Sequence, residues 1–535
     1  MRVFIGVAWP YASGPRHLGH LAGAYLPADV VARYHRIVGD EVLMVSGSDQ
    51  HGTPITLAAE AAGVSPADFA DHQHARIEAS LRRAGISFDH YSRTGAATHH
   101  RVVGEVFADL WRAGLIYQDT ARSAWCPAEG RSLPDRYVQG GCPYCKVEDA
   151  RGDQCDGCGR TLDPDQLVQP TCRRCGAAAT FRPMRQLFLA LDRMEAKLTD
   201  YVEARAPGWR RFVAEETRGI LAGGLRARAI TRDLDWGVRV PLEGWDDRRL
   251  YVWFDAVIGY LSASKEWADA HGRPEVWRQW WEDAGALHRY FIGKDNLFFH
   301  TLFWPALIMG TGRGLHLPDD VVASQYLTMA GAQMSSSRGH GFDLDDALGR
   351  LGADRLRHAL CARSPESSDT EFNYQQAGEL TRTGLLGGVA NPAHRVTTLL
   401  WSRFGGRPDK DAWAGATVER AEASEWLRQA GKAIARVELR SALEHVHALG
   451  RTVNQRLARS EPWRLPDAEA QACLTSLLPY LEALAVAAWP IVPETASRIR
   501  LLLGRSERPT AWAIDPAPPR LTEPLRAPLD PSPGS

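Results

Sequence analysis

The sequence predicts an α/β fold that is interrupted by a cysteine-rich module and followed by an all-helical region. In the N-terminal part, short apolar runs are followed by turns rich in glycine and proline and then by helical patterns, as is typical of parallel sheets. Seven of the nine cysteines lie between Cys126 and Cys175. From about residue 370 onward, apolar residues recur at helical spacing, as at Leu439, Leu443 and Val446.

Length and charge limit the classes of protein to consider. The chain has 535 residues, enough for several domains, and its formal net charge of −1 excludes a globally basic nucleic-acid-binding protein. The sequence contains neither an uninterrupted run of about eighteen apolar residues nor a signal-peptide pattern. We therefore expect a cytoplasmic protein without a membrane span, and a monomer because no feature indicates dimerisation.

The first stretch, residues 4–20, combines a buried strand, a turn with two prolines and a glycine, and a helix start at residues 17–20 (HLGH). Free N–H groups and the helix dipole favour an anion at such a helix start. The imidazoles of His17 and His20 can donate hydrogen bonds to phosphate oxygens, and Gly19 lets a nucleotide approach the backbone. On these four residues alone, two surface histidines at a helix start are the simpler interpretation.

A second apolar run, residues 41–46, indicates another parallel strand and is followed by Asp49. Ligands of open α/β sheets bind just past the carboxyl ends of the strands. Asp49 can therefore hold the ammonium group of a substrate. A turn or helix-capping role is the alternative.

Two cysteine pairs have the spacing of a zinc site. The pairs Cys142-x-x-Cys145 and Cys155-x-x-Cys158 are separated by nine residues. Four thiolates at this spacing suit tetrahedral zinc, and in a chain without a leader such clustering favours metal over disulfides. The sequence predicts a structural zinc knuckle here.

A second cysteine set is incomplete. Cys172 and Cys175 form one half-site, and the other half is Cys126-Pro-Ala-Glu129, where Glu129 stands in the place of a cysteine. This set either holds zinc through three sulfurs and a carboxylate or holds no metal.

Three later segments have aromatic or polar patterns, two of which suggest further parts of a site. Residues 250–260 form an aromatic strand-to-helix segment whose side chains either line a pocket or pack in a core. Residues 290–296 have the pattern of a ligand loop at the end of a strand. Residues 331–339 form a polar loop that, taken alone, indicates a linker.

The order of these features resembles the methionyl-tRNA synthetase family of class I aminoacyl-tRNA synthetases over residues 1–510. Residues 17–20 match the family's HIGH signature, and residues 47–55 (GSDQHGTPI) match its strand-end segment. Residues 251–260 and 291–306 match two further family blocks. The resemblance implies a Rossmann-type catalytic domain with a zinc-knuckle connective insertion, followed by an all-α, anticodon-binding-like helix bundle.

The resemblance also implies domain boundaries. We expect two halves of the catalytic domain (1–115 and 229–322), the connective insertion (116–228), a linking region with the family's mobile loop (323–369), the helical domain (370–514) and a disordered proline-rich tail (515–535).

The implied reaction joins ATP, with Mg²⁺, and an amino acid into an aminoacyl adenylate, releases pyrophosphate and passes the acyl group to an acceptor. The implied catalytic residues are His17, His20, Gln333 and Ser336. The implied ATP contacts are His17, Gly19, His20, Gly293, Asp295 and Met334. The implied amino-acid contacts are Trp9, Tyr11, Asp49, Trp253, Ala256, Val257, Tyr260, Asn296 and His300. Anticodon recognition is implied for Asn391, Arg395 and Trp463.

Several positions depart from the family. The family's KMSKS loop is QMSSS at residues 333–337, so both lysines are missing. The loss of one charged transition-state donor commonly costs about 3 to 4 kcal/mol. Trp9 replaces an aliphatic residue, Val257 a proline and Asn296 an apolar residue. These changes favour a smaller or more polar amino acid, unless backbone shifts accommodate them.

Three hypotheses follow. The first is a specialised paralogue that activates another amino acid for a small-molecule acceptor, as hydrazine-forming synthetases with a cupin partner do; the partner would be a separate protein. The alternative is a methionine–tRNA ligase with an unusual loop. The third is an inactive, tRNA-binding protein. Whether tRNA is a partner stays open at this point.

Overall fold

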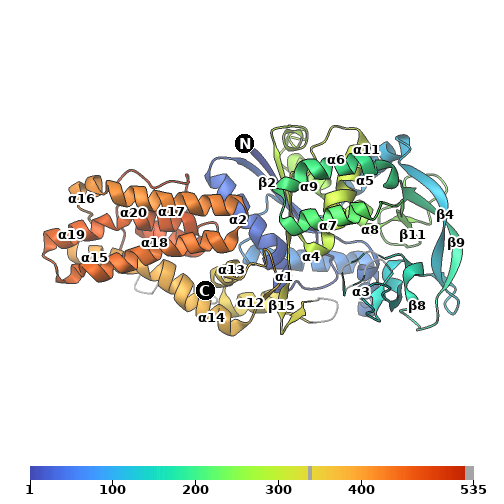
Figure 1. Cartoon of the computed structure of the whole chain (residues 1–535), viewed down its shortest axis with the longest axis horizontal. Helices are drawn as coiled ribbons and strands as arrows, with labels where there is room; N and C mark the ends of the chain where they lie inside the picture. Colours follow the sequence, from blue (N-terminus) through green and yellow to red (C-terminus); the bar gives the residue numbers. More distant parts are fainter. Residues whose placement is uncertain (153–154, 156, 159, 161, 335–339, 524–535) are drawn as a thin grey trace.

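The computed structural model describes residues 1–152, 155, 157–158, 160, 162–334 and 340–523. The molecule is elongated, with the helical domain at one end and the long pair of the insertion, β4 (Ile116–Cys126) and β9 (Thr180–Leu189), at the other (Figure 1). The parallel sheet lies between these two ends.

The central sheet has five parallel strands in the order β14-β13-β1-β2-β3. They are β1 (Arg2–Val7), β2 (Glu41–Ser48), β3 (His90–Arg93), β13 (Leu287–Gly293) and β14 (Asp320–Ser324). The strand order reverses between β1 and β13, and in such sheets ligands bind at this switch point. The fold expected from the apolar runs is confirmed.

Alternate side chains of β1 enter two different cores, as the pleat of a strand requires. Val3 and Ile5 belong to a core shared with α2 and the helical domain, whereas Phe4 packs against Trp281 and Tyr290 on the other face. The helices that cover the sheet or lead into it are α1 (Leu18–His20), η1 (Leu21–Tyr25), α2 (Leu26–Ile37), α3 (Thr53–Ala62), α4 (Pro66–Arg83), α5 (Ala97–Arg112), α8 (Val252–Ala256), α9 (Gly259–Ala270), α10 (Arg278–Trp281), η7 (Phe299–Phe303) and α11 (Trp304–Thr311).

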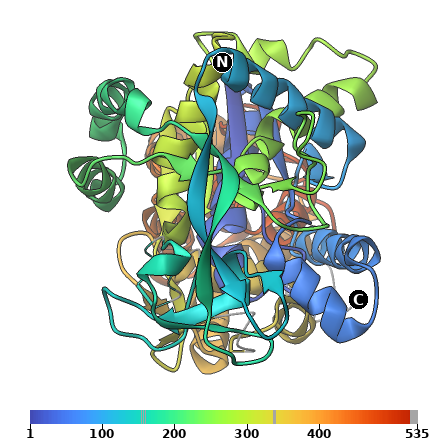
Figure 2. The same cartoon turned by 90° about the vertical axis from the view of Figure 1, so that its right-hand side faces the viewer.

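The insertion is built on a long antiparallel pair, β4 (Ile116–Cys126) and β9 (Thr180–Leu189), whose register runs from Ile116↔Leu189 to Trp125↔Thr180. Figure 2 shows this twisted ribbon crossing in front of the sheet. The chain segment that connects the two strands forms a small cysteine-rich core. The other elements of the insertion are β5 (Arg131–Ser132), β6 (Val138–Gly141), β7 (Ala150–Arg151), β8 (Val168–Cys172), α6 (Glu195–Arg205) and α7 (Arg211–Ala222).

The described part of the linking region ties the sheet to the helical domain. It contains β15 (Leu327–Met329), β16 (Ala332–Gln333), α12 (Leu344–Leu351) and α13 (Ala353–Ala362). From α13 the buried Arg357 forms an ion pair of 2.7 Å with Asp29 and donates to the backbone carbonyls of Pro490 and Ile491. The two ends of the molecule therefore share one buried network.

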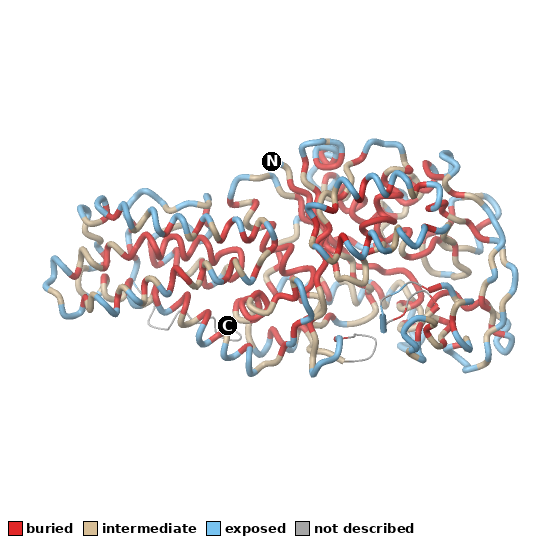
Figure 3. Tube along the Cα trace, in the orientation of Figure 1, coloured by how far each residue is buried: buried red, intermediate tan, exposed pale blue. Residues whose placement is uncertain are grey.

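The helical domain has the buried stripe that the helical spacing predicted: Leu439, Leu443 and Val446 are all buried (Figure 3). Its helices are α14 (Tyr374–Leu380), η9 (Thr381–Ala390), α15 (Asn391–Phe404), α16 (Lys410–Gly415), α17 (Thr417–Ala435), α18 (Leu439–Ser460), α19 (Asp467–Ser476), α20 (Leu478–Ala488) and α21 (Pro493–Leu502). Of the described residues, one stretch, Asp467–Ala488, is long and apolar enough for a membrane span by composition. Its apolar window is 78% buried inside this domain, as in a core helix.

The expectation of a disordered tail from residue 515 is wrong for residues 515–523. The indole of Trp413 donates to the carbonyl of Pro516 (3.1 Å), Leu521 is buried, and the Thr522 N–H donates to the Leu502 carbonyl (3.0 Å). Proline lacks an N–H but keeps its carbonyl, so a proline-rich segment can still bind along a helical surface. Residues 524–535 lie outside the described residues.

Candidate active site

The HLGH motif begins a helix directly beside the switch point of the sheet. The His17 Nδ1 accepts the Gly19 N–H (3.1 Å), and the His20 Nδ1 accepts the His17 N–H (3.4 Å). Each ring therefore uses Nδ1 as an acceptor, which leaves the proton of the neutral imidazole on Nε2. Both histidines thus keep an Nε2–H donor for a ligand.

Burial keeps these two imidazoles neutral. It lowers the pKa of His17 to about 3, with a further contribution from the Arg16 guanidinium, and lowers the pKa of His20 well below its usual value. Neutral donors, rather than cations, are what this motif offers to an anion.

The loop that corresponds to KMSKS begins beside HLGH. A Cβ added at Gly341 would lie 3.1 Å from the Cβ of Met334 and 3.4 Å from the Cβ of His17. Met334 itself is buried in the core, so its side chain is not a free ATP contact. Gln333 is exposed on β16, opposite Thr328. Ser336 lies outside the described residues.

The loop after β13 forms the other wall of the nucleotide side. The Tyr326 hydroxyl donates to Asp295, and Lys294 binds Gln325 (2.8 Å) and Asp369 (3.0 Å). Gly293 ends β13 next to them. Sequence reasoning identified Asp295 and Gly293 but missed Tyr326, which lies two residues past the end of β14, the next strand of the sheet.

Asp49 lies where the strand pattern placed it, just past β2. Its backbone pairs with the segment after β1: Asp49 N–H donates to the Pro10 carbonyl (2.9 Å) and Asp49 accepts the Ala12 N–H (2.7 Å). This bridge also fixes Tyr11 beside Asp49. Burial, followed by the charge of Asp255, raises the pKa of Asp49 well above its usual value.

Aromatic residues form the wall predicted for the substrate side chain. The Trp253 ring stacks on Phe299 with centroids 3.9 Å apart, and Tyr260 lies 2.8 Å from the Nε2 of His300. Since the His300 Nδ1 lies 2.9 Å from the Asn296 carbonyl, which can only accept, Nδ1 carries the proton and Tyr260 donates to Nε2. Ala256 and Val257 are buried beside them.

Trp9 occupies a slot made by two glycines. A Cβ added at Gly47 would lie 2.6 Å from the Trp9 ring, and one added at Gly259 would lie 2.8 Å from it. The indole of Trp9 therefore fits into space left by two missing side chains, so a tryptophan at this position need not take that space from the substrate. Asn296 is only partly buried, so its amide is not forced to find a protein partner.

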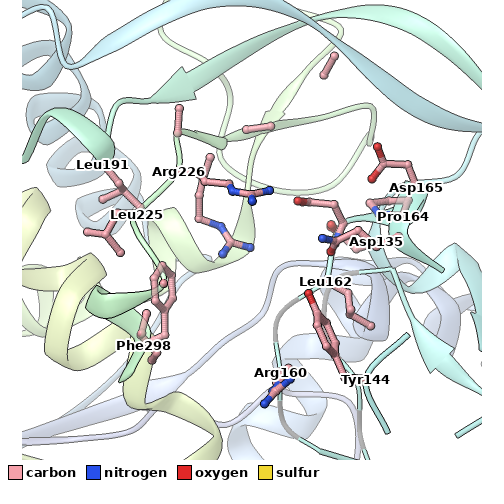
Figure 4. Close-up of a pocket in the computed structure, with 18 of the residues that line it drawn as sticks. Asp135, Tyr144, Arg160, Leu162, Pro164, Asp165, Leu191, Leu225, Arg226 and Phe298 are labelled. Atoms are coloured by element: carbon pink, nitrogen blue, oxygen red, sulfur yellow. The ribbon is translucent and has the colours of Figure 1, made fainter. Parts of the chain in front are cut away.

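A cavity of about 1320 Å³ separates the insertion from the catalytic domain and extends to Asp295 and Tyr326. Figure 4 shows Arg226, Leu225 and Phe298 on one side and Tyr144, Arg160 and Asp135 on the other. The cavity thus gives the nucleotide side an opening toward the knuckles.

The four cysteines of the first knuckle converge. Their sulfurs lie within 4.8 Å of one another, with 4.0 Å between Cys142 and Cys158 and 3.5 Å between Cys145 and Cys155. Sulfurs at the corners of a zinc tetrahedron with 2.3 Å bonds lie about 3.8 Å apart. The residues present fit a zinc ion.

In the second set, Cys126, Cys172 and Cys175 also gather within 4.8 Å. The Glu129 carboxylate does not join them, because it pairs with Arg174 (3.2 Å), which in turn pairs with Glu60 of α3. Of the two alternatives left open for this set, the one with three sulfurs and a carboxylate is therefore not assembled in this structure.

The three expected anticodon residues are exposed on the helical domain. Asn391 and Arg395 lie one turn apart on α15, and Arg395 approaches Asn454 of α18 (3.5 Å). Trp463 is 44% exposed in the turn after α18, next to the carboxyl end of α15, where Arg403 binds the Pro462 carbonyl.

Comparison with known proteins identifies the family. The family model for class I tRNA synthetases (M) matches residues 3–397. A methionine–tRNA ligase of Dehalococcoides mccartyi is 45% identical over 510 residues, covering 94% of this chain and 91% of that protein. The chain belongs to the methionyl-tRNA synthetase family.

Further relatives agree with this assignment. A methionine–tRNA ligase of Thermomicrobium roseum is 43% identical over 507 residues, covering 94% of this chain and 87% of that protein. The crystal structure of Mycobacterium tuberculosis methionyl-tRNA synthetase bound by methionyl-adenylate superposes with a TM-score of 0.80 and 25% identity, covering 99% and 100% of the two chains.

The chain is therefore an aminoacyl-adenylate-forming ligase with the class I synthetase fold. The names of its relatives favour the methionine–tRNA ligase alternative over the specialised paralogue. They lend no support to a cupin partner.

Proposed function

We propose that this member of the methionyl-tRNA synthetase family joins methionine to tRNA in protein synthesis. Methionine and ATP would give methionyl adenylate and pyrophosphate, and the methionyl group would then pass to the 3′-terminal ribose of the tRNA. The observation that carries the proposal is 43–45% identity to methionine–tRNA ligases over 94% of the chain.

In this proposal, the Nε2–H groups of His17 and His20 donate to phosphate oxygens of ATP. Their hydrogen bonds strengthen as charge develops in the transition state, and the preorganised helix start requires no rearrangement. Asp295, held by Tyr326, contacts the adenosine. ATP enters with Mg²⁺, and no described residue is assigned to the ion.

Methionine would lie with its ammonium group on Asp49 and its side chain between Trp253, Tyr260 and His300. The slot at Gly47 and Gly259 supports this placement of methionine, because the indole of Trp9 lies in the slot and leaves room for the methionine side chain. Tyr260 donates to His300, so its oxygen faces the substrate as an acceptor only. A site lined by aromatic rings suits an unbranched thioether.

We further propose that the acceptor end of the tRNA enters through the cavity between the insertion and the catalytic domain. That cavity extends to Asp295, and Arg160 lies over the ring of Tyr144 (4.8 Å) on its wall. Arginine and aromatic side chains suit a single strand, whose phosphates are anionic and whose bases stack. Asn391, Arg395 and Trp463 would bind the anticodon at the other end of the molecule.

The first knuckle would hold a structural zinc ion through Cys142, Cys145, Cys155 and Cys158. Zinc supplies the folding free energy that this small, loop-rich core lacks, and it takes no part in the chemistry in this proposal.

Charging of tRNA with radiolabelled methionine by the purified full-length chain tests the proposal. We expect acid-precipitable label that depends on ATP. A Trp463→Ala variant should lose charging while it keeps methionine-dependent ATP–pyrophosphate exchange. Absence of charging by the unmodified chain, with exchange intact, would contradict the assignment of tRNA as the acceptor.

A further inference from the structure

Two buried carboxylates lie side by side at the amino-acid site, and the mechanism above uses only one of them. Asp49 is 4% exposed, and Asp255 of α8 is fully buried. A carboxylate oxygen of each and a ring nitrogen of His51 all lie within 4.8 Å of one another. Among the described residues, no lysine or arginine forms an ion pair with either carboxylate.

Asp255 is held by histidines alone. Its Oδ2 accepts from the Nδ1 of His51 (3.0 Å), while its Oδ1 has no hydrogen-bond partner and lies 3.9 Å from the Nε2 of His99. His99 is fixed from its other side, because its Nδ1 donates to Ser262 (2.8 Å), which itself donates to the Gly259 carbonyl. The Nδ1–H of His99 thus points to Ser262 and away from Asp255.

Asp49 keeps one oxygen open. Its Oδ1 accepts from the His51 N–H (3.0 Å) and the Thr94 hydroxyl (3.5 Å), and its Oδ2 accepts no hydrogen bond from the described residues. The remaining titratable neighbours are Tyr11, paired with Asp49 through the backbone, and His100, whose ring packs on His51.

Two adjacent buried carboxylates without a lysine or arginine partner cost free energy if both are ionised. A proton on one of the two carboxylates removes their mutual repulsion and lowers this cost. The pKa directions agree with this picture. Burial and the Asp255 charge raise the pKa of Asp49. At Asp255 burial also raises the pKa, but His51 and His99 together lower it by more. Asp255 is thus the ionised member of the pair, and Asp49 carries the proton.

We propose that Asp49 is protonated in the empty enzyme and releases its proton when the ammonium group of the substrate binds, with Asp255 and His51 as the positioning residues that set this state. The carboxylic acid and the substrate ammonium give a carboxylate–ammonium pair and one proton, which leaves to solvent. This inference rests on the proposed function only in that the substrate is an amino acid held by Asp49.

Calorimetry of methionine binding to the full-length protein tests the proposal directly. At about pH 7, in buffers of different ionisation enthalpy, we expect release of about one proton per methionine bound. Between about pH 6 and about pH 8 the KM for methionine in ATP–pyrophosphate exchange should fall by up to about tenfold per pH unit, since deprotonated Asp49 binds the ammonium.

A matched pair of variants assigns the effect to Asp255. Asp255→Asn removes the neighbouring charge, so the pKa of Asp49 should fall, with fewer protons released and a flatter pH dependence of KM. Asp411→Asn, an exposed carboxylate of α16, should behave like the unmodified chain.

The outcomes separate the two proposals. Absence of methionine-dependent exchange in the unmodified chain would refute the proposed function. Exchange without proton release on binding would refute this inference alone, even if Asp255→Asn failed to fold. A folded Asp255→Asn variant that released as many protons as the unmodified chain would show that Asp255 does not set the protonation state of Asp49.

Discussion

The slot that holds Trp9 can be tested by a double-mutant cycle. A Cβ at Gly259 would lie 2.8 Å from the Cζ2 of Trp9 and 2.9 Å from two further ring atoms, so its three nearest contacts are all with the indole and Gly259→Ala overpacks against that ring. Overpacking of this kind costs about 1 to 3 kcal/mol. Trp9→Leu alone should cost about 2 kcal/mol through the cavity it leaves. Combined, Trp9→Leu and Gly259→Ala should cost at least about 1 kcal/mol less than the sum of the single changes.

Gly47→Ala provides the matched control. Its Cβ would lie 2.5 Å from the backbone oxygen of Ser92 as well as 2.6 Å from the Trp9 ring. Backbone cannot give way as a side chain can, so Trp9→Leu should not rescue Gly47→Ala. The free energies of unfolding come from urea denaturation, and the KM for methionine from ATP–pyrophosphate exchange. The reasoning fails if Gly259→Ala is harmless alone, or if its cost and that of Trp9→Leu simply add.

Four further predictions follow from the site. The substitutions Gln333→Lys and Ser336→Lys together should raise the rate of ATP–pyrophosphate exchange by up to about 10²-fold per restored donor. An unchanged rate would mean that other residues neutralise the charge of the pyrophosphate leaving group. Cys142→Ser should lower bound zinc, measured by elemental analysis, by one ion per chain; unchanged zinc would exclude the first knuckle as its site. Burial lowers the pKa of His17 to about 3, so below about pH 6.5 the unfolded chain takes up protons that the native ring does not, and the free energy of unfolding in urea should fall as the pH falls. His17→Gln should weaken this dependence, and an identical pH profile would show that His17 is not buried and neutral. Trp463→Ala should raise the KM for tRNA but not for methionine, and equal effects on both would point to a folding defect.

Much of the fold could be predicted from local patterns. The apolar runs that became β1 and β2 have the pattern of strands buried on both faces, which is typical of a parallel sheet covered by helices. The spacing of Cys142, Cys145, Cys155 and Cys158 likewise determines a tetrahedral cluster without knowledge of the fold.

The site was harder to predict because its decisive contacts join distant parts of the chain. Trp9 seemed too large for a methionine site because the glycines that make room for it, Gly47 and Gly259, are 38 and 250 positions away and meet it only in the folded chain. The pairing of His51 with Asp255, 204 positions apart, left no local signal either. The prediction of a disordered tail was wrong for a related reason. A high proline content predicts little regular secondary structure, but it does not tell whether the backbone carbonyls find hydrogen-bond donors elsewhere in the chain, as the carbonyl of Pro516 does.

The measurement that tests the central claim most directly is ATP–pyrophosphate exchange by the purified chain against all twenty amino acids, with and without tRNA. We predict that methionine alone supports exchange and that radiolabelled methionine, added in a parallel reaction, is transferred to tRNA when tRNA is present. Exchange driven by a smaller or more polar amino acid, with no transfer to tRNA, would contradict the account and restore the specialised-paralogue hypothesis.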